Sequence, residues 1–170
     1  MKRLNLLLAA ILFVAVSAFG ATDYGLTVGG VDVTSDNCSN ITGDNIKQYK
    51  TDVEYYIKYD PSTKTLTIKN IKIKRTGSYN RAILNNDVDG LKIVFIGDND
   101  LDTEDSSPVR LNNNTTITSL DGGKTGIYGD SEDAITIGEG KTLIIDNAHL
   151  AIKAYNSNAI IGDTGDETVI

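Results

Sequence analysis

Apolar and polar residues alternate in short runs along most of the chain. The runs are rich in Ile, Val, Thr and Tyr, and they are broken by Gly, Asn and Asp. This period of two predicts β-strands, and no stretch after residue 20 sustains a helical period. We therefore expect an all-β domain.

The first strands are predicted to form hairpins. In residues 26–33, alternating apolar residues flank Gly29 and Gly30, which can supply the positive φ angles of a tight turn. A second hairpin is expected around residues 60–64, where an aspartate can bond back to the backbone and a proline presets its own φ. Residues 21–64 are thus predicted to form an N-terminal β-hairpin cap.

From residue 65 onward the apolar pattern repeats about every 26 residues. It recurs in three columns that stay in phase, which is hard to obtain by chance. The columns are Leu66, Leu91, Ile117, Leu143 and Val169; Leu101, Ile127 and Ile152; and Ile83, Val109, Ile135 and Ile160.

Three short strands in each repeat favour a right-handed parallel β-helix, a solenoid over residues 65–170. Each strand would stack on its equivalent about 4.8 Å away, and parallel crossovers strongly prefer the right hand. The alternative is an antiparallel β-sandwich, in which turns have similar spacing. A new strand would begin at residues 168–170. We therefore expect a solenoid truncated at its C-terminus, whose edge needs further rungs or a partner.

The N-terminus has the features of an export signal. Lys2 and Arg3 precede an apolar run, and small residues follow it, which predicts a signal peptide over residues 1–20 cleaved between about Ala18 and Ala21. The run is too short to span a bilayer. We expect a bacterial protein that is secreted, periplasmic or on the cell surface, with no transmembrane segment after cleavage.

Charge and cysteine content narrow the function classes. The formal net charge is −7, and most of the excess acid lies in residues 82–170. Such a surface repels phosphate backbones, so we expect no nucleic-acid partner. The only cysteine, Cys38, cannot form an internal disulfide.

Two acidic stretches are candidates for a calcium site. They lie in residues 98–105 and 130–133, about one repeat apart, and Ca²⁺ takes six to eight oxygen ligands. The alternative is a solvated acidic ridge, partly neutralised by basic residues of the preceding rung, namely Lys72, Lys74, Arg75 and Arg81. The candidate ligands are Asp102, Glu104, Asp105, Asp130, Glu132 and Asp133.

Two tyrosines are candidates for contact with sugar rings. Tyr128 and Tyr155 fall within one residue of equivalent positions on adjacent rungs. A stacked pair on an outer face would suit a linear polysaccharide, although the chain has no tryptophan and these tyrosines can also be ordinary half-buried strand residues.

Catalytic residues are not indicated. His149 is the only histidine, with no nucleophile marked beside it and no partner ligands for zinc. Paired carboxylates on neighbouring rungs would be needed for a glycosidase, but the acids fall in turns.

Three regions of the chain resemble known proteins. Residues 24–34 (YGLTVGGVDVT) and 59–70 (YDPSTKTLTIKN) resemble the opening of uncharacterised secreted proteins from Gram-negative gut anaerobes. The rungs in residues 82–162 resemble β-helical carbohydrate-binding domains related in fold to pectate lyases. Some of those relatives bind acidic plant polysaccharide with calcium, but their ligand residues cannot be matched here.

These observations lead to three ranked expectations for the function. The first is a non-catalytic, secreted or surface β-solenoid that binds a polysaccharide or a host or surface glycan, with calcium as an optional ligand. The second is a structural or adhesin-like surface module. The third is the N-terminal part of a polysaccharide lyase or glycoside hydrolase.

Overall fold

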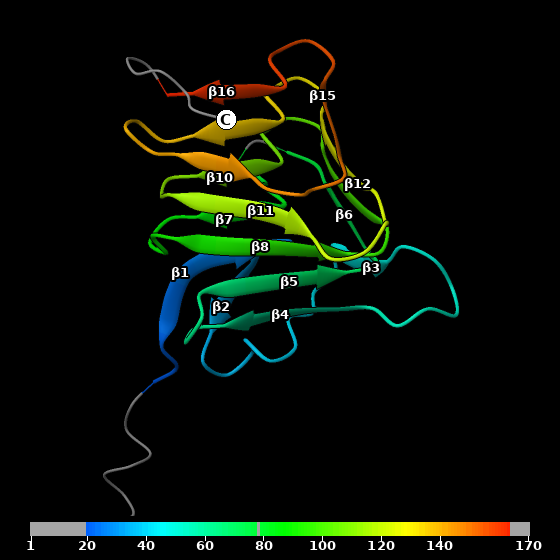
Figure 1. Cartoon of the computed structure of the whole chain (residues 1–170), viewed down its shortest axis with the longest axis vertical. Coiled ribbons are helices and arrows are strands. Elements are labelled where there is room, and N and C mark those ends of the chain that lie inside the picture. Colours follow the sequence, from blue (N-terminus) through cyan, green and yellow to red (C-terminus); the bar gives the residue numbers. More distant parts are fainter. Residues whose placement is uncertain (1–19, 78, 164–170) are drawn as a thin grey trace, which may run out of the picture.

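The structure is a computed structural model that describes residues 20–77 and 79–163. It is all-β, with sixteen strands and no helix in this part of the chain (Figure 1). The predicted signal peptide, apart from residue 20, and Val169 of the first column lie outside the described residues. The strands are β1 (Asp23–Val28), β2 (Val31–Thr34), β3 (Ile46–Gln48), β4 (Tyr56–Asp60), β5 (Thr65–Lys69), β6 (Ile71–Arg75), β7 (Ile83–Asn85), β8 (Leu91–Ile96), β9 (Asn99–Thr103), β10 (Val109–Leu111), β11 (Thr115–Ser119), β12 (Thr125–Gly129), β13 (Ile135–Ile137), β14 (Leu143–Ile145), β15 (Leu150–Ala154) and β16 (Ile160–Gly162).

The strands stack into three sheets that wind as a parallel β-solenoid of about four turns (Figure 1). The first sheet has the order β16-β13-β10-β7-β1-β2, the second β14-β11-β8-β5-β4, and the third β15-β12-β9-β6-β3. From β5 onward, each turn gives one strand to each sheet, and equivalent strands pair in parallel. The predicted solenoid is confirmed, and the sandwich alternative is wrong.

Two of the three predicted columns are confirmed by strand register. Leu101 pairs with Ile127, which pairs with Ile152. The third column is paired throughout, beginning with Ile83 and Val109.

The first predicted column is wrong by two residues. Leu66 is level with Ile93 rather than Leu91, and Leu91 is level with Thr115. The level residues Leu66, Ile93, Ile117 and Ile145 are 27, 24 and 28 residues apart, because the connection at residues 112–114 is shorter than those at 86–90 and 138–142. Leu91 and Ile93 both face inward, so the apolar pattern alone does not reveal the shift.

The N-terminal strands cover one edge of all three sheets. Strands β1, β3 and β4 pair antiparallel with β7, β6 and β5, respectively. The predicted turns are present: Gly29 and Gly30 have φ angles of 59° and 83°, and the carboxylate of Asp60 accepts a bond from the Ser62 backbone. Paired edges do not template aggregation, so this arrangement protects the start of the solenoid.

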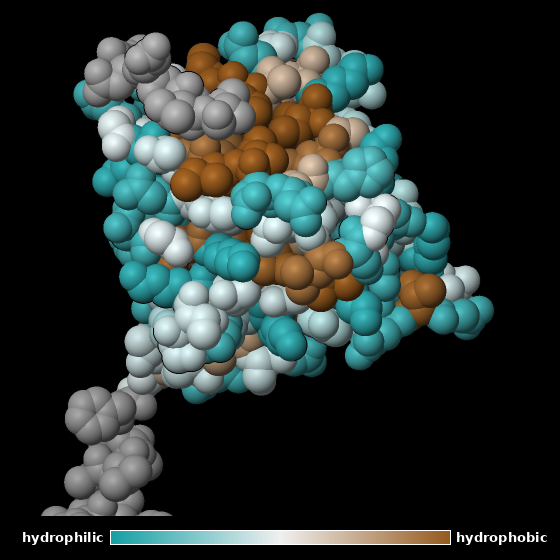
Figure 2. All heavy atoms as spheres, viewed as in Figure 1, coloured by the Kyte–Doolittle hydropathy of each residue, from teal (hydrophilic) through white to brown (hydrophobic). Residues whose placement is uncertain are grey.

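The core consists of inward aliphatic side chains stacked from turn to turn. In the third sheet, Ile73, Leu101 and Ile127 are fully buried and lie level with one another. In the last turn the equivalent Ile152 is only partly buried. Hydrophobic atoms accordingly gather at the surface around this end of the solenoid (Figure 2). The prediction that this edge takes further rungs or a partner stays a prediction.

Two asparagine side chains form hydrogen bonds to backbone groups at inner corners of the solenoid. Asn85 is fully buried, and its carboxamide bonds to both the N–H and the C=O of Val88. Asn99 accepts a bond from the Ile71 backbone and donates to the hydroxyl of Thr125 in the next turn. Corner backbone groups are thereby satisfied inside a core that water does not reach.

Candidate functional site

The first candidate site is a depression on the outer face of the third sheet. Tyr128 points outward from β12 and is level with Asp102 on β9 and Lys153 on β15. Tyr155 follows β15 and is 58% exposed. The depression has a volume of about 290 Å³, and we call it the tyrosine surface. Its lining residues are Lys74, Asp100, Asp102, Glu104, Tyr128, Asp130 and Tyr155.

A glycine determines how Tyr128 lies. A Cβ atom at Gly126 would be 2.3 Å from Cε2 of Tyr128 and 2.7 Å from its hydroxyl oxygen. The ring is therefore folded back along its own strand, across a position with no side chain. The aromatic ring therefore lies along the outer surface of the sheet instead of projecting away from it.

Tyr155 is positioned by the backbone and by a cation. Its N–H donates to the carbonyl of Gly129 in the preceding turn at 3.0 Å. The Lys153 ammonium lies 4.0 Å from the centre of the Tyr155 ring, within cation–π range. The two predicted tyrosines thus come from consecutive turns and line the same depression. They are two residues out of level rather than one, because Tyr128 is level with Lys153.

Lysines of β6 partly neutralise the acids of this surface. Lys72 pairs with Asp100 at 3.1 Å, and Lys74 lies 3.4 Å from Glu104 and 3.7 Å from Asp102. Burial raises the pKa of Asp102, and the positive charge of Lys74 opposes that rise. Burial, and next the Asp100 charge, raise the pKa of the Tyr128 hydroxyl. The surface therefore offers carboxylate acceptors and an ammonium donor beside aromatic rings. The expectation that the acids fall in turns is wrong for Asp100 and Asp102, which lie on strand β9.

The six predicted calcium ligands divide between two depressions. Asp102, Glu104 and Asp130 line the tyrosine surface, whereas the other three line a second groove. The chain turns a corner between β9 and β10 and again between β12 and β13, so acids before and after each corner face different sides. Within residues 20–77 and 79–163, no group of three or more Asp, Glu, His or Cys side chains is arranged to hold a metal ion. The geometry gives the calcium hypothesis no support.

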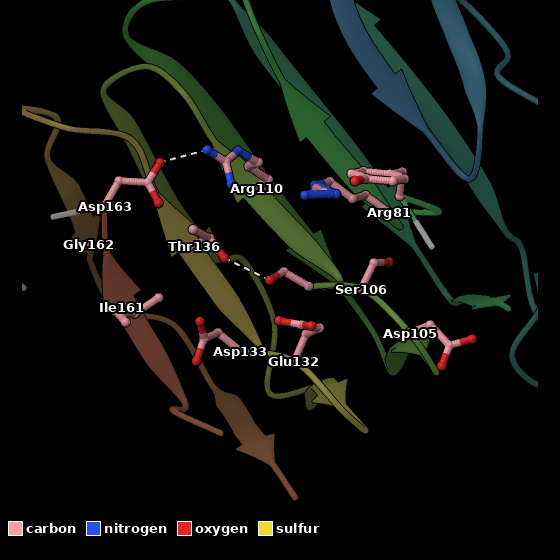
Figure 3. A pocket seen from close by; sticks show the side chains of 12 residues that line it. Arg81, Asp105, Ser106, Arg110, Glu132, Asp133, Thr136, Ile161, Gly162 and Asp163 are labelled. Atoms are coloured by element: carbon pink, nitrogen blue, oxygen red, sulfur yellow. Dashed lines mark hydrogen bonds and ion pairs between the residues drawn. The ribbon is translucent and has the colours of Figure 1, made fainter. Parts of the chain in front are cut away.

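The second groove lies around the corner, where the turn loops meet the first sheet (Figure 3). Its volume is about 460 Å³, and we call it the arginine groove. Arg110 projects from the middle of β10, level with Thr136 on β13. Arg81 comes from the loop before β7. The lining residues are Tyr79, Arg81, Asp105, Ser106, Ser107, Arg110, Glu132, Asp133, Thr136, Ile161, Gly162 and Asp163.

Sequence reasoning gave the arginines no role in binding. It treated Arg81 only as one of the basic residues that neutralise the acidic ridge. Lys72 and Lys74 do form those pairs, but Arg75 bonds to Asn80 instead, and Arg81 forms no ion pair in the described part of the chain. The feature of the sequence that could have indicated this groove is Arg110, a charged residue at the centre of an otherwise aliphatic strand.

His149 lies outside both depressions. Its Nδ1 is 3.4 Å from the carbonyl oxygen of Gly122, in a separate surface hollow. Among the residues that line this hollow, Asp121 is the one carboxylate.

Comparison of the chain with models of known protein families, with curated proteins and with solved structures finds no match. The resemblance to secreted β-helix proteins therefore stays a prediction. Over the described residues, no helix is long and apolar enough to cross a membrane.

Proposed function

We propose that this chain is a secreted or surface-exposed, non-catalytic module that binds a glycan at the tyrosine surface. The observation that carries the proposal is the meeting of Tyr128 and Tyr155, from consecutive turns, in one depression with three partly neutralised carboxylates. Sugar rings present apolar C–H faces that pack on aromatic rings, and their hydroxyls donate to carboxylates.

The shape of the surface also favours an extended ligand. Equivalent residues repeat along the solenoid axis, so a chain molecule running across the turns meets one turn after another. The net charge of −7 disfavours nucleic acid as that chain molecule. A hydroxyl-rich polymer suits both the aromatic rings and the carboxylates.

Binding is expected to depend on Tyr155. We expect Tyr155→Ala to weaken the affinity for a bound glycan about tenfold, which corresponds to about 1.4 kcal/mol. The reason is the loss of the most exposed ring of the surface. Residues 21–170 are first screened on a glycan array, and the best ligand is then titrated by calorimetry against the wild type and the variant.

The matched control is Tyr55→Ala, because Tyr55 is 50% exposed and lies in the N-terminal region away from the tyrosine surface. Each titration is run with Ca²⁺ and with EDTA. We expect equal affinities in the two buffers. Loss of binding in EDTA would favour the calcium hypothesis, and a folded sample that binds no glycan would refute the proposed function.

A second variant tests the placement of Tyr128. Gly126→Ala is expected to displace the Tyr128 ring and to lower glycan affinity several-fold, because the new methyl group occupies the space of the ring. The obstacle is a side chain that can swing away, so the melting temperature is expected to change little. Gly122→Ala is the control, since nothing lies within 4 Å of a Cβ there. Unchanged affinity in Gly126→Ala would mean that the ring position does not matter for binding.

One observation favours a structural or adhesin-like role instead. Three isoleucines of the last described turn, Ile145, Ile152 and Ile160, are only partly buried. Hydrophobic atoms gather at the surface around this end of the solenoid (Figure 2). Exposed apolar clusters often mark contact surfaces. If the protein binds no glycan, this end of the solenoid is where a protein contact is to be sought.

A further inference from the structure

The arginine groove contains a guanidinium that forms no ion pair within residues 20–77 and 79–163. Nε of Arg81 is buried and has no hydrogen-bond partner, and Arg81 forms no ion pair among the described residues. Burial lowers the pKa of Arg81, and the neighbouring Arg110 charge lowers it further. A partly desolvated, unpaired charge is costly, and an anion in the groove would offset that cost.

The other arginine of the groove is already engaged. Arg110 donates to the carboxylate of Asp163 at 2.6 Å (Figure 3) and to the Asn112 side chain at 2.9 Å. Two hydroxyls, those of Ser107 and Thr136, lie 2.7 Å apart on the wall of the groove. The groove thus combines one uncommitted guanidinium with hydroxyl groups that can bond to a ligand.

Most acids of the groove are occupied or directed elsewhere. Asp163 is bound to Arg110, and one oxygen of Asp133 accepts three bonds, from the Ser157 hydroxyl and from the backbone and side chain of Asn158. Asp105 is exposed and points away from the arginines (Figure 3). Glu132 is exposed and near enough for its charge to act on Arg81, but it forms no ion pair with it. Glu132 is therefore the main acid that competes with an incoming anion, and the charge of Asp163 acts on Arg81 to a smaller extent.

We propose that the arginine groove binds a carboxylate group of the glycan, with Arg81 donating to the carboxylate and the Ser107 and Thr136 hydroxyls bonding to the same sugar unit. The inference rests on the proposed function for its choice of a glycan. The corner loops connect the two depressions: Glu104 lines the tyrosine surface while its neighbour Asp105 lines the groove. A guanidinium matches the planar, two-oxygen geometry of a carboxylate better than an ammonium does.

The test compares two variants of opposite sign. The probes are a glucuronate-containing oligosaccharide and the same oligosaccharide with its carboxyl groups reduced to alcohols. Arg81→Gln is expected to lower the affinity for the acidic probe about tenfold or more, because a charge-assisted bond is lost. Glu132→Gln is expected to raise it about threefold, because a competing charge is removed. Neither variant is expected to change the affinity for the reduced probe.

A readout that does not depend on the tyrosine surface separates the two proposals. Glucuronate monosaccharide is titrated into ¹⁵N-labelled protein, and the Arg81 Nε–H resonance is assigned by its absence in Arg81→Gln. We expect this resonance to shift. A shift without oligosaccharide binding refutes only the proposed function of the tyrosine surface.

Three outcomes overturn the inference. One is an unmoved Arg81 resonance, and another is an Arg81→Gln variant with the wild-type ratio of affinities for acidic and reduced probes. The third is equal binding of a glutamate-rich peptide, which would show a carboxylate site without preference for sugar. Arg81→Lys serves as the fold control, because it keeps the charge and loses only the forked geometry; we expect it to melt like the wild type and to bind the acidic probe weakly.

Discussion

Ile127→Ala is expected to lower the free energy of unfolding by about 3 kcal/mol. Ile127 is fully buried in the third sheet and is stacked between Leu101 and Ile152 of the adjacent turns. Truncation removes buried methyl and methylene groups and leaves a cavity between two turns that cannot close without bending the sheet. Urea unfolding followed by circular dichroism measures the change.

The same substitution at two other isoleucines provides controls. Ile152 occupies the equivalent position one turn later but is only partly buried, so Ile152→Ala is expected to cost clearly less. Ile144 is 52% exposed, and Ile144→Ala is expected to change stability by less than about 0.5 kcal/mol. An Ile152→Ala loss as large as that of Ile127→Ala would contradict this gradient, and would mean that something covers the last turn in solution.

Asn85→Ala is expected to cost a similar amount, about 3 kcal/mol, through unsatisfied backbone groups. Asn85 is 0% exposed. Its carboxamide bonds to the N–H of Val88 at 3.0 Å, to the C=O of Val88 at 2.9 Å and to the hydroxyl of Thr115 at 3.2 Å. Alanine would leave three polar groups without this partner at a corner that is closed to water.

A leucine variant separates lost hydrogen bonds from lost volume. Asn85→Leu fills the space but makes none of the bonds, so we expect it to be no more stable than Asn85→Ala. Asn45→Ala is the surface control, since Asn45 is exposed and makes a single long bond to the Gly29 carbonyl. Recovery of wild-type stability in Asn85→Leu would show that packing, not hydrogen bonding, holds this corner.

The local pattern was sufficient to predict the strands and two of their three stacked columns. Inward residues such as Leu101 and Ile127 keep a nearly constant spacing because the connection between their turns hardly changes in length. The column that begins at Leu66 was misplaced because the loops that lead into the second sheet differ in length, the loop at residues 112–114 being shorter than those at 86–90 and 138–142. Loop length is free to vary at a solvent-exposed corner, and an assumed constant spacing of about 26 residues between turns misses that variation.

The candidate site was predictable in part. One repeat of about 26 residues separates Glu104 from Asp130, and their loops do bond to each other: the Asp130 and Ser131 backbones donate to the carbonyls of Thr103 and Glu104. The same reasoning placed all six acids together, whereas the corner turns three of them into the arginine groove. Sequence spacing gives the height of a residue along the solenoid but not the direction in which its side chain points.

The arginine groove was not predictable from spacing at all. Whether Arg81 lacks a partner depends on which side of the corner Glu132 and Asp163 occupy. It also depends on Arg110, which is paired with Asp163. These are relations among side chains that are far apart in the chain and are packed by different turns.

The sequence by itself determined that this protein is a β-solenoid with antiparallel hairpins at its start. The alternation of apolar and polar residues predicts the strands, and the repeat of the apolar pattern predicts the length of one solenoid turn. Only the tertiary structure decided the register of the second sheet, the folding of Tyr128 over Gly126, and the division of the acids between two depressions. The physical reason is that a repeat length constrains the rise of the chain along one axis, whereas corner angles and side-chain partners are set by packing between turns.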